Sequence, residues 1–155
     1  MAAGPPPAGV VNNLRASFLA GLPHGVDPFQ TRAMDALDDG SSVLVAAPTG
    51  SGKTIVAEYA IHMARSRKKR AFYTAPIKAL SNQKYRDLCA IHGVANVGLV
   101  TGDNAHNADA PVVVMTTEVL RNMIYASSHR LDDLGAVILD EVHFLQDAYR
   151  GPVWE

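Results

Sequence analysis

The sequence lacks the features that mark secreted and membrane-spanning proteins. It holds one cysteine, Cys89, in 155 residues, so it cannot form an internal disulfide, which suits a reducing cytoplasm. No apolar run approaches the roughly 18 residues that a membrane-spanning helix needs. The N-terminus also lacks the basic and then apolar pattern of a secretory signal. We therefore expect a cytoplasmic protein with no membrane association.

An excess of positive charge is missing as well. The 14 Lys and Arg residues are balanced by 15 Asp and Glu residues, which gives a formal net charge of −1. The chain as a whole therefore has no basic footprint for nucleic acid. Its one dense basic cluster, at 65–70, closes an apolar helical stretch, where cations complement the helix dipole. A solvated helix end explains this cluster, and a binding patch is the alternative.

What the chain does contain is a regular alternation of apolar runs and helical patterns. Apolar residues make up 48% of the sequence and charged residues 19%, which is typical of a soluble globular domain. Continuous apolar strands that alternate with helices predict an α/β fold, with a mostly parallel sheet covered on both faces. The predicted strands are 42–48, 71–76, 97–102, 111–117 and 136–142. We expect 1–19, which include a Pro-Pro-Pro run, to be a flexible tail and 20–155 to be one domain.

The strongest motif is "AAPTGSGKT", Ala46 to Thr54, between the first predicted strand and a helix. Glycines allow backbone conformations that turn successive N–H groups toward one anion, and the start of the helix adds its positive end. Lys53 would place a cation on the outer phosphates of a nucleotide, and the Thr54 hydroxyl would hold Mg²⁺. We predict a phosphate-binding loop; the alternative is a chance Gly-Ser turn. Its residues are Ala47, where the usual pattern has glycine, Pro48, Thr49, Gly50, Ser51, Gly52, Lys53 and Thr54.

Two neighbouring carboxylates, Asp140 and Glu141, end the last apolar run. Side by side they repel each other and resist burial, so their placement calls for a positive partner. If this strand lies beside the phosphate-loop strand, Asp140 reaches the Mg²⁺ held by Thr54. Glu141 then faces the water that attacks the terminal phosphate, and can orient or deprotonate it. A bound cation and triphosphate would make the pair tolerable.

The motifs also occur in a family-like order. "AAPTGSGKT", "TAPIKALSNQK", "VTGD", "MTTEVLRNM" and "LDEVH" together resemble the first motor domain of superfamily-two DExH-box helicases. "DPFQ", "PIKALSNQKY" and "DEVHFLQDAYRGPVWE" look most like the superkiller-type helicases that serve the RNA exosome. The resemblance covers the predicted domain, 20–155. It implies a RecA-like P-loop NTPase domain that uses ATP and Mg²⁺.

The resemblance assigns further roles residue by residue. Gln30 would read the adenine base, His143 would couple the nucleotide site to the rest of the motor, and His24 stands where the family often has an aromatic residue against the base. A further group would hold a single nucleic-acid strand through its phosphates and sugars. Its members are Pro76, Lys78, Ser81, Thr101, Gly102, Thr116, Thr117 and Glu118. Thr116 to Glu118 can also be a helix cap with a first-turn acid, and Lys78 can be a plain solvated lysine.

The resemblance also implies parts that this sequence does not contain. After Glu155 the family continues with a Ser-Ala-Thr motif and a second RecA-like domain, which supplies arginine fingers and the other half of the strand-binding groove. We therefore expect an N-terminal piece of the first motor domain, truncated at its C-terminus. Alone, it should bind nucleotide weakly and unwind nothing.

The leading hypothesis is the ATP-binding and hydrolysing half of an ATP-dependent helicase, with single-stranded RNA as partner and RNA-degradation machinery as a possible one. A DNA translocase on the same motor stays open, because contacts with the backbone ignore base identity. A GTPase switch would need an Asn-Lys-x-Asp motif, which the chain lacks. A scaffold with a dead ATP site is disfavoured by the intact Lys53, Thr54, Asp140 and Glu141.

Overall fold

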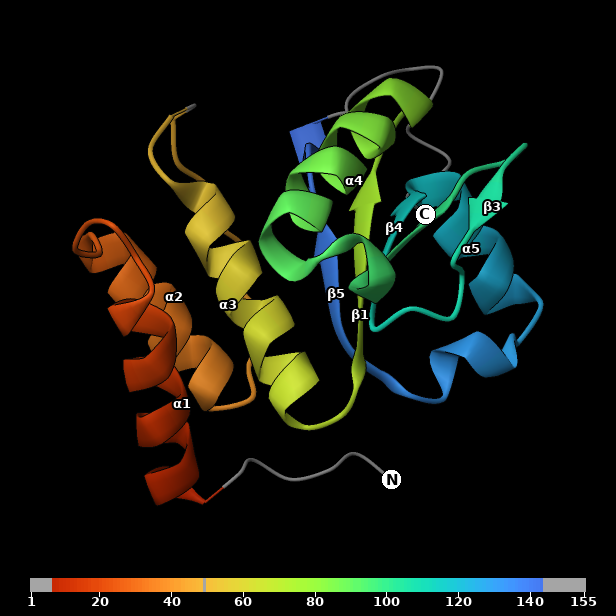
Figure 1. The fold of residues 1–155 in the computed structure, drawn as a ribbon. Coiled ribbons are helices and arrows are strands. Elements are labelled where there is room, and N and C mark those ends of the chain that lie inside the picture. The colour runs from red at the N-terminus through yellow and green to blue at the C-terminus, as the bar shows by residue number, and fades with distance from the viewer. Residues whose placement is uncertain (1–6, 49, 144–155) are drawn as a thin grey trace. The chain divides into compact units, whose positions relative to one another are not determined.

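The computed structural model describes residues 7–48 and 50–143 (Figure 1). The chain divides into two compact units, Met1–Ser66 and Arg67–Glu155. The first unit contains helices and the second an α/β arrangement. Within the described residues, no helix is both long and apolar enough to cross a membrane.

The described residues of the first unit form three helices, α1 (Ala8–Ala20), α2 (Pro28–Asp38) and α3 (Lys53–Ser66). Its core consists of Met34, Tyr59 and Met63, and Leu14 and Phe18 of α1 pack against it. The Phe18 and Tyr59 rings lie 5.2 Å apart between centroids. The structure thus differs from the predicted flexible tail over 1–19, because apolar side chains of α1 are covered by the other helices. Residues 1–6 lie outside the described residues.

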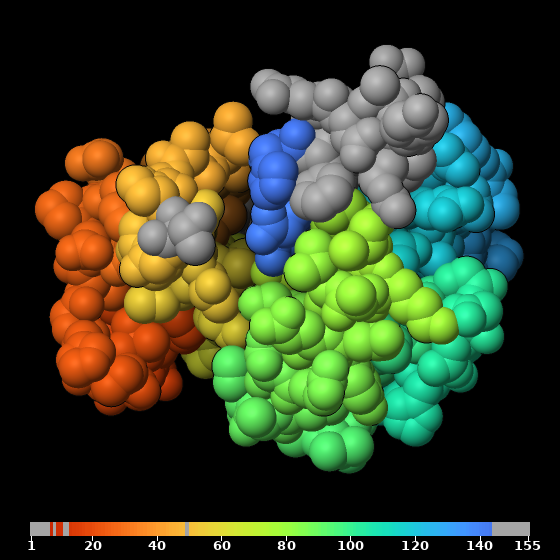
Figure 2. Space-filling view, turned by 90° about the horizontal axis from the view of Figure 1, so that it is seen from above, coloured from red at the N-terminus to blue at the C-terminus, as the bar shows by residue number. Residues whose placement is uncertain are grey.

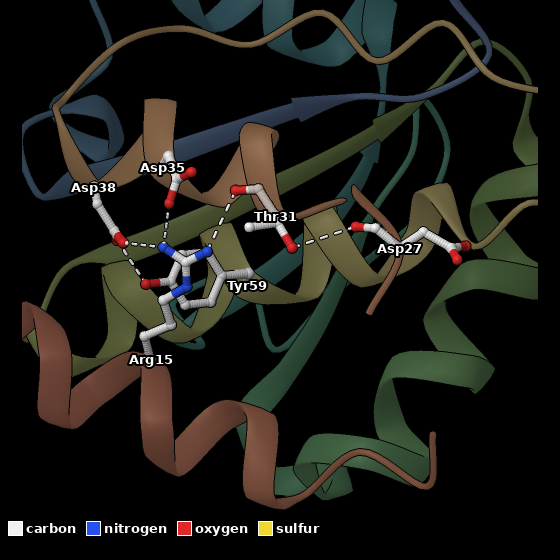
Figure 3. A network of polar contacts seen from close by, with 6 residues as sticks. All are labelled: Arg15, Asp27, Thr31, Asp35, Asp38 and Tyr59. Carbon is white, nitrogen blue, oxygen red and sulfur yellow. Dashed lines mark hydrogen bonds and ion pairs between the residues drawn. The ribbon is translucent and has the colours of Figure 1, made fainter. Parts of the chain in front are cut away.

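A network of polar contacts also ties the three helices together (Figure 3). The guanidinium of Arg15 forms ion pairs with Asp35 and, at 3.3 Å, with Asp38, and it donates to the backbone oxygen of Thr31. The Tyr59 hydroxyl of α3 donates to the same Asp38 carboxylate. Burial works against the charged guanidinium, yet the Asp35 hydrogen bond and the two carboxylates together raise the pKa of Arg15. The network therefore holds a well-paired cation between α1 and α2.

Up to residue 143, where the described part of the chain ends, the second unit forms a five-stranded sheet with helices. Its strands have the order β3-β2-β4-β1-β5, and they are parallel except for β3, which is antiparallel to β2. The prediction of an α/β fold with a mostly parallel sheet is confirmed. The strands are β1 (Arg70–Ala75), β2 (Val97–Val100), β3 (Ala105–His106), β4 (Val112–Thr116) and β5 (Leu134–Leu139); the helices are α4 (Lys78–His92), α5 (Thr117–Tyr125) and the 3-10 turns Val94–Asn96 and His129–Leu131.

Both faces of the central strands are covered, as the apolar runs predict. Phe72 of β1 packs in one cluster with Met115 of β4 and Leu120 of α5. The next residue, Tyr73, points to the opposite face, where the ammonium of Lys84 on α4 lies 5.2 Å from its ring centroid. Helices α5 and α4 therefore cover opposite faces of the sheet.

Strand β5 and the segment 42–48 depart from the prediction. Val137 and Leu139 of β5 are 43% and 47% exposed, and among the described residues β5 pairs only with β1. The segment 42–48 was predicted as a strand but forms none, and Leu44 is 80% exposed. A strand needs a neighbour to pair its N–H and C=O groups, and the described part of the first unit contains no other strand.

Candidate nucleotide and nucleic-acid site

The phosphate loop has the backbone that its glycines predict. Gly50 and Gly52 have φ angles of 81° and 84°, in the left-handed region where a side chain is disfavoured. The helix α3 begins directly at Lys53, and the side chains of Lys53 and Thr54 are exposed. An exposed cation and hydroxyl at a helix start are suited to an anionic ligand. Thr49 lies outside the described residues.

Gln30 of α2 is hydrogen-bonded to the phosphate loop. Its side-chain amide donates to the backbone oxygen of Gly52 at 2.9 Å, and its carbonyl oxygen accepts the backbone N–H of Asp27 at 2.8 Å. A Cβ atom at Gly52 would lie 2.5 Å from the Gln30 amide nitrogen, so a side chain there would displace the Gln30 amide, and the φ angle of Gly52 also disfavours it. Gln30 is only 2% exposed. The structure thus shows a link between α2 and the loop, and contact with an adenine base stays a prediction.

Asp140 is fixed by three hydrogen bonds just beyond the end of β5. Its backbone N–H donates to the carbonyl of Thr74 at 3.0 Å. One carboxylate oxygen accepts from the hydroxyl of Tyr73, and the other accepts from the backbone N–H of Glu141 at 2.9 Å. Each oxygen keeps a further lone-pair direction, so the carboxylate still fits a hard cation such as Mg²⁺.

The neighbouring Glu141 has a strained backbone. Its φ angle is 57°, a left-handed conformation that costs a residue with a side chain about 1–2 kcal/mol. Its carboxylate lies 3.1 Å from the imidazole of His143, so two predicted catalytic residues are in direct contact. Strain of this kind concentrates at functional sites, which supports a functional role for this turn.

The four parallel strands of the second unit end at one edge of the sheet. Their pairing sets Ala75 opposite Thr116, Val100 opposite Met115, and Thr74 opposite Leu139. The residues that follow each strand therefore gather at that edge. Figure 2 looks onto this edge from above, with the end of β5 in blue and the start of α4 in yellow-green. The predicted residues placed there are Pro76, Lys78, Thr101, Gly102, Thr116, Thr117, Glu118, Asp140 and Glu141.

Not all of the predicted strand-holding side chains are accessible. Ser81 is completely buried, and its hydroxyl donates to the backbone oxygen of Ile77, the residue before α4. Thr101 and Thr117 are each 5% exposed; the Thr101 hydroxyl donates to Asp103, and the Thr117 hydroxyl has no hydrogen-bond partner among the described residues. The capping interpretation is confirmed, because the Thr116 hydroxyl accepts the backbone N–H of Val119, with Glu118 in the first turn of α5. Nucleic-acid contact by these residues stays a prediction.

Two residues of the site were missed by the sequence analysis. Asp103 pairs with Lys78 at 2.6 Å between ammonium and carboxylate, and it accepts a hydrogen bond from the Thr101 hydroxyl at 3.1 Å. Asp103 is the last residue of the "VTGD" motif, so the motif itself could have indicated that it belongs to the site. Tyr73 lies 67 positions before Asp140. Their contact arises from the pairing of β1 with β5, so no local sequence pattern predicts it.

Thr54 and Asp140 belong to different units of the chain, so a shared Mg²⁺ stays a prediction. Their hydroxyl and carboxylate oxygens are ligands that Mg²⁺ prefers. The described residues contain no group of three His, Cys, Asp or Glu side chains that could hold a metal by themselves. A site that uses one carboxylate, one hydroxyl and nucleotide phosphates would not produce such a group.

A glycine-rich loop that opens a helix with Lys-Thr, together with an Asp-Glu pair at the carboxyl edge of a parallel sheet, defines the class of phosphate-loop nucleotide-binding proteins. Within that class, the family model described as DEAD/DEAH box helicase matches residues 27–155. The chain therefore belongs to the DEAD/DEAH box helicase family.

Similar proteins include the probable helicase HelY of Mycobacterium leprae, 59% identical over 140 residues that make up 90% of this chain and 15% of that protein. The antiviral helicase SKI2 of Saccharomyces cerevisiae is 50% identical over 133 residues, or 86% of this chain and 10% of that protein. The chain thus spans about a tenth to a seventh of the length of these relatives.

Solved structures show the same fold. The Mycobacterium smegmatis helicase Lhr, bound to single-stranded DNA and AMP-PNP, matches with a TM-score of 0.63 and 27% identity over 97% of this chain and 22% of that chain. A hypothetical ATP-dependent RNA helicase from Sulfolobus tokodaii matches with a TM-score of 0.64 over 96% of this chain and 45% of that chain, at 20% identity. The fold is therefore the RecA-like fold of helicase motor domains, as the resemblance implied.

Proposed function

We propose that this chain is the ATP-binding and hydrolysing part of an ATP-dependent RNA helicase. The observation that carries the proposal is the common edge of the sheet, where the Asp140-Glu141 pair, the segments after β1 and β2 and the start of α5 come together. One edge can then sense both nucleotide and strand. RNA is favoured because relatives of about 50% identity are described as RNA helicases, such as mtr4 of Schizosaccharomyces pombe.

In this proposal the phosphate loop and the carboxylate pair serve one ATP molecule. Lys53 and the loop amides hold the outer phosphates, while Thr54 and Asp140 hold Mg²⁺. When bound, Mg²⁺ neutralises charge on the phosphates. Tyr73 and the N–H of Glu141 keep the Asp140 carboxylate in one orientation. Glu141 orients or deprotonates the attacking water, and His143 holds Glu141.

Support for a shared site comes from the open edge of β5. Among the described residues, β5 has a strand on one side only, so the N–H and C=O groups of its other edge have no neighbouring strand. The apolar segment 42–48 leads directly into the phosphate loop and has the length of a strand. We propose that it pairs with β5 in the working motor, which would bring the loop beside Asp140.

A DNA substrate is the second candidate. Lhr, which is 27% identical to this chain, is bound to single-stranded DNA in its structure. Contacts with phosphates and sugars do not distinguish RNA from DNA by sequence. The stimulation of ATP hydrolysis by single-stranded RNA and by single-stranded DNA, compared at equal salt, decides between the two. A larger stimulation by DNA would contradict the RNA assignment.

The remaining parts of the proposal concern the protein beyond this sequence. Because the chain spans a small share of its relatives, we propose that it continues into a second RecA-like domain, which completes the strand-binding groove. RNA-degradation machinery is the proposed protein partner. A cytoplasmic location, which the single cysteine suits, is also proposed.

The replacement Glu141→Gln tests the catalytic assignment in the full-length protein, meaning the longest natural chain that contains this sequence. Loss of a general base lowers turnover by about 100-fold or more, while ATP binding should be retained because the amide keeps the size of the side chain. Asp132→Asn is the control, because Asp132 is an exposed carboxylate that precedes β5, whereas Asp140 and Glu141 follow it. Unchanged hydrolysis in the Glu141→Gln protein would show that another residue activates the water.

A further inference from the structure

The carboxylate of Asp103 interacts with two side chains, Lys78 and Thr101, that are predicted to donate to the nucleic-acid strand. The ammonium of Lys78 lies 2.6 Å from one oxygen of Asp103. The Thr101 hydroxyl donates to the other oxygen at 3.1 Å. Phosphate oxygens accept hydrogen bonds from the same kinds of donor. Asp103 thus takes the place of an anion at the proposed strand-binding edge.

The fold buries the Thr101 side chain and places the Lys78–Asp103 ion pair at the surface. Thr101 follows β2 directly and is 5% exposed, and its backbone N–H donates to the carbonyl of Asn104 at 2.7 Å. This short turn places Asp103 at the surface, where its side chain is 68% exposed, and the paired Lys78 is 53% exposed. An ion pair so exposed is weak. A competing anion can therefore displace it.

We propose that Asp103 is an anionic gate of the nucleic-acid site, which holds Lys78 and Thr101 in the free protein and is displaced by a phosphate of the incoming strand. This inference rests on the proposed function and adds a residue to it. Displacement leaves a negative charge next to a negatively charged strand. The gate therefore lowers the affinity for nucleic acid and selects ligands whose other contacts offset the displacement.

The charge argument gives the direction of the effect. Asp103→Asn keeps the shape and an acceptor oxygen for Thr101 but removes the competing charge. Lys78 is then available to a phosphate from the start. The affinity for single-stranded RNA should rise by about two- to fivefold, the range of an exposed ion pair. The salt dependence should become steeper by about one unit in the log–log slope, because no carboxylate takes up a cation when the strand binds.

The experiment measures binding of fluorescent oligouridylate to the full-length protein, with a non-hydrolysable ATP analogue present, across a range of salt concentrations. The variants are Asp103→Asn, Lys78→Gln and the two combined. Asp109→Asn is the control, because Asp109 is an exposed carboxylate that lies between β3 and the start of β4, 3.9 Å from Arg130 and away from the carboxyl ends of the parallel strands. Under the proposal, Lys78→Gln weakens binding more when Asp103 is already replaced, and Asp109→Asn shows neither the affinity rise nor the steeper slope.

The outcomes separate the gate from the proposed function. Weaker or unchanged binding by Asp103→Asn, together with a clear loss in Lys78→Gln, overturns the gate alone; weaker binding would show in addition that Asp103 orients Lys78. No effect of Lys78→Gln in either background overturns the assignment of Lys78 to the strand, and the gate with it. An equal gain in affinity for oligouridylate in the Asp109→Asn variant would show that the effect comes from the net charge of the protein, and would overturn the gate.

Discussion

Arg15 and Lys78 are both paired with carboxylates on a neighbouring segment, but in opposite surroundings. The Arg15 side chain is 20% exposed and has contacts with Asp35, Asp38 and the Thr31 carbonyl. The Lys78 side chain is 53% exposed and is paired with Asp103 alone among the described residues. A planar guanidinium with five donors suits a fixed network, and an ammonium on a flexible stem suits exchange between partners. The comparison indicates that one pair holds helices together while the other is available to a ligand.

The largest expected effect breaks the Arg15 network from within. Asp38 is 12% exposed in its side chain and accepts from both Arg15 and Tyr59. Asp38→Ala should lower the free energy of local unfolding of the first unit by about 2 kcal/mol, because it weakens the pairing of a partly buried charge. Hydrogen exchange of α1, α2 and α3 in the full-length protein measures this.

Asp35→Ala is the matched control for that prediction. Asp35 pairs with the same guanidinium but is 58% exposed, so its loss should cost less than about 1 kcal/mol. Equal losses for the two variants would mean that burial does not distinguish these carboxylates. The comparison between a fixed and an exchangeable pair would then lose its basis.

The smaller effect concerns the pH dependence of the exposed pair. The hydrogen bond from Lys78, then that from Thr101, lowers the pKa of Asp103 below its ordinary value of 3.8. A lowered pKa means that the contact is fully present above the ordinary value and is lost as the pH falls through the lowered one. Lys78→Gln should therefore raise the pKa of Asp103, which a carboxyl titration by NMR detects. An unchanged pKa would show that the pair is not formed in solution.

The sequence predicted the parts of this molecule that depend on local pattern. The phosphate loop and the start of α3 are predicted by Gly50, Gly52 and Lys53. The four parallel strands are predicted by continuous apolar runs. The helix α1 was missed because a Pro-Pro-Pro run precedes it and its apolar residues acquire meaning only against Tyr59 and Met63. The Tyr73–Asp140 contact was also inaccessible, since strand pairing joins residues far apart in the chain.

The segment 42–48 also shows that local pattern alone does not determine structure. Its apolar pattern predicts a strand, but a strand forms only where a neighbour supplies hydrogen bonds. Gln30 is similar, because the family resemblance assigns it to base recognition, which stays a prediction, while only the fold shows its hydrogen bond to Gly52. Pattern thus indicates which residues can act, and packing decides with what they interact.

The central claim is that Thr54 and Asp140 serve one Mg²⁺ bound to ATP. A double-mutant cycle with Thr54→Ala and Asp140→Asn tests it most directly, with the Mg²⁺-dependent part of ATP affinity in the full-length protein as the readout. If the two residues share the ion, the double variant should lose little more than the worse single variant, because interacting sites are not additive. Losses that add fully would place the two residues at independent sites and contradict the account.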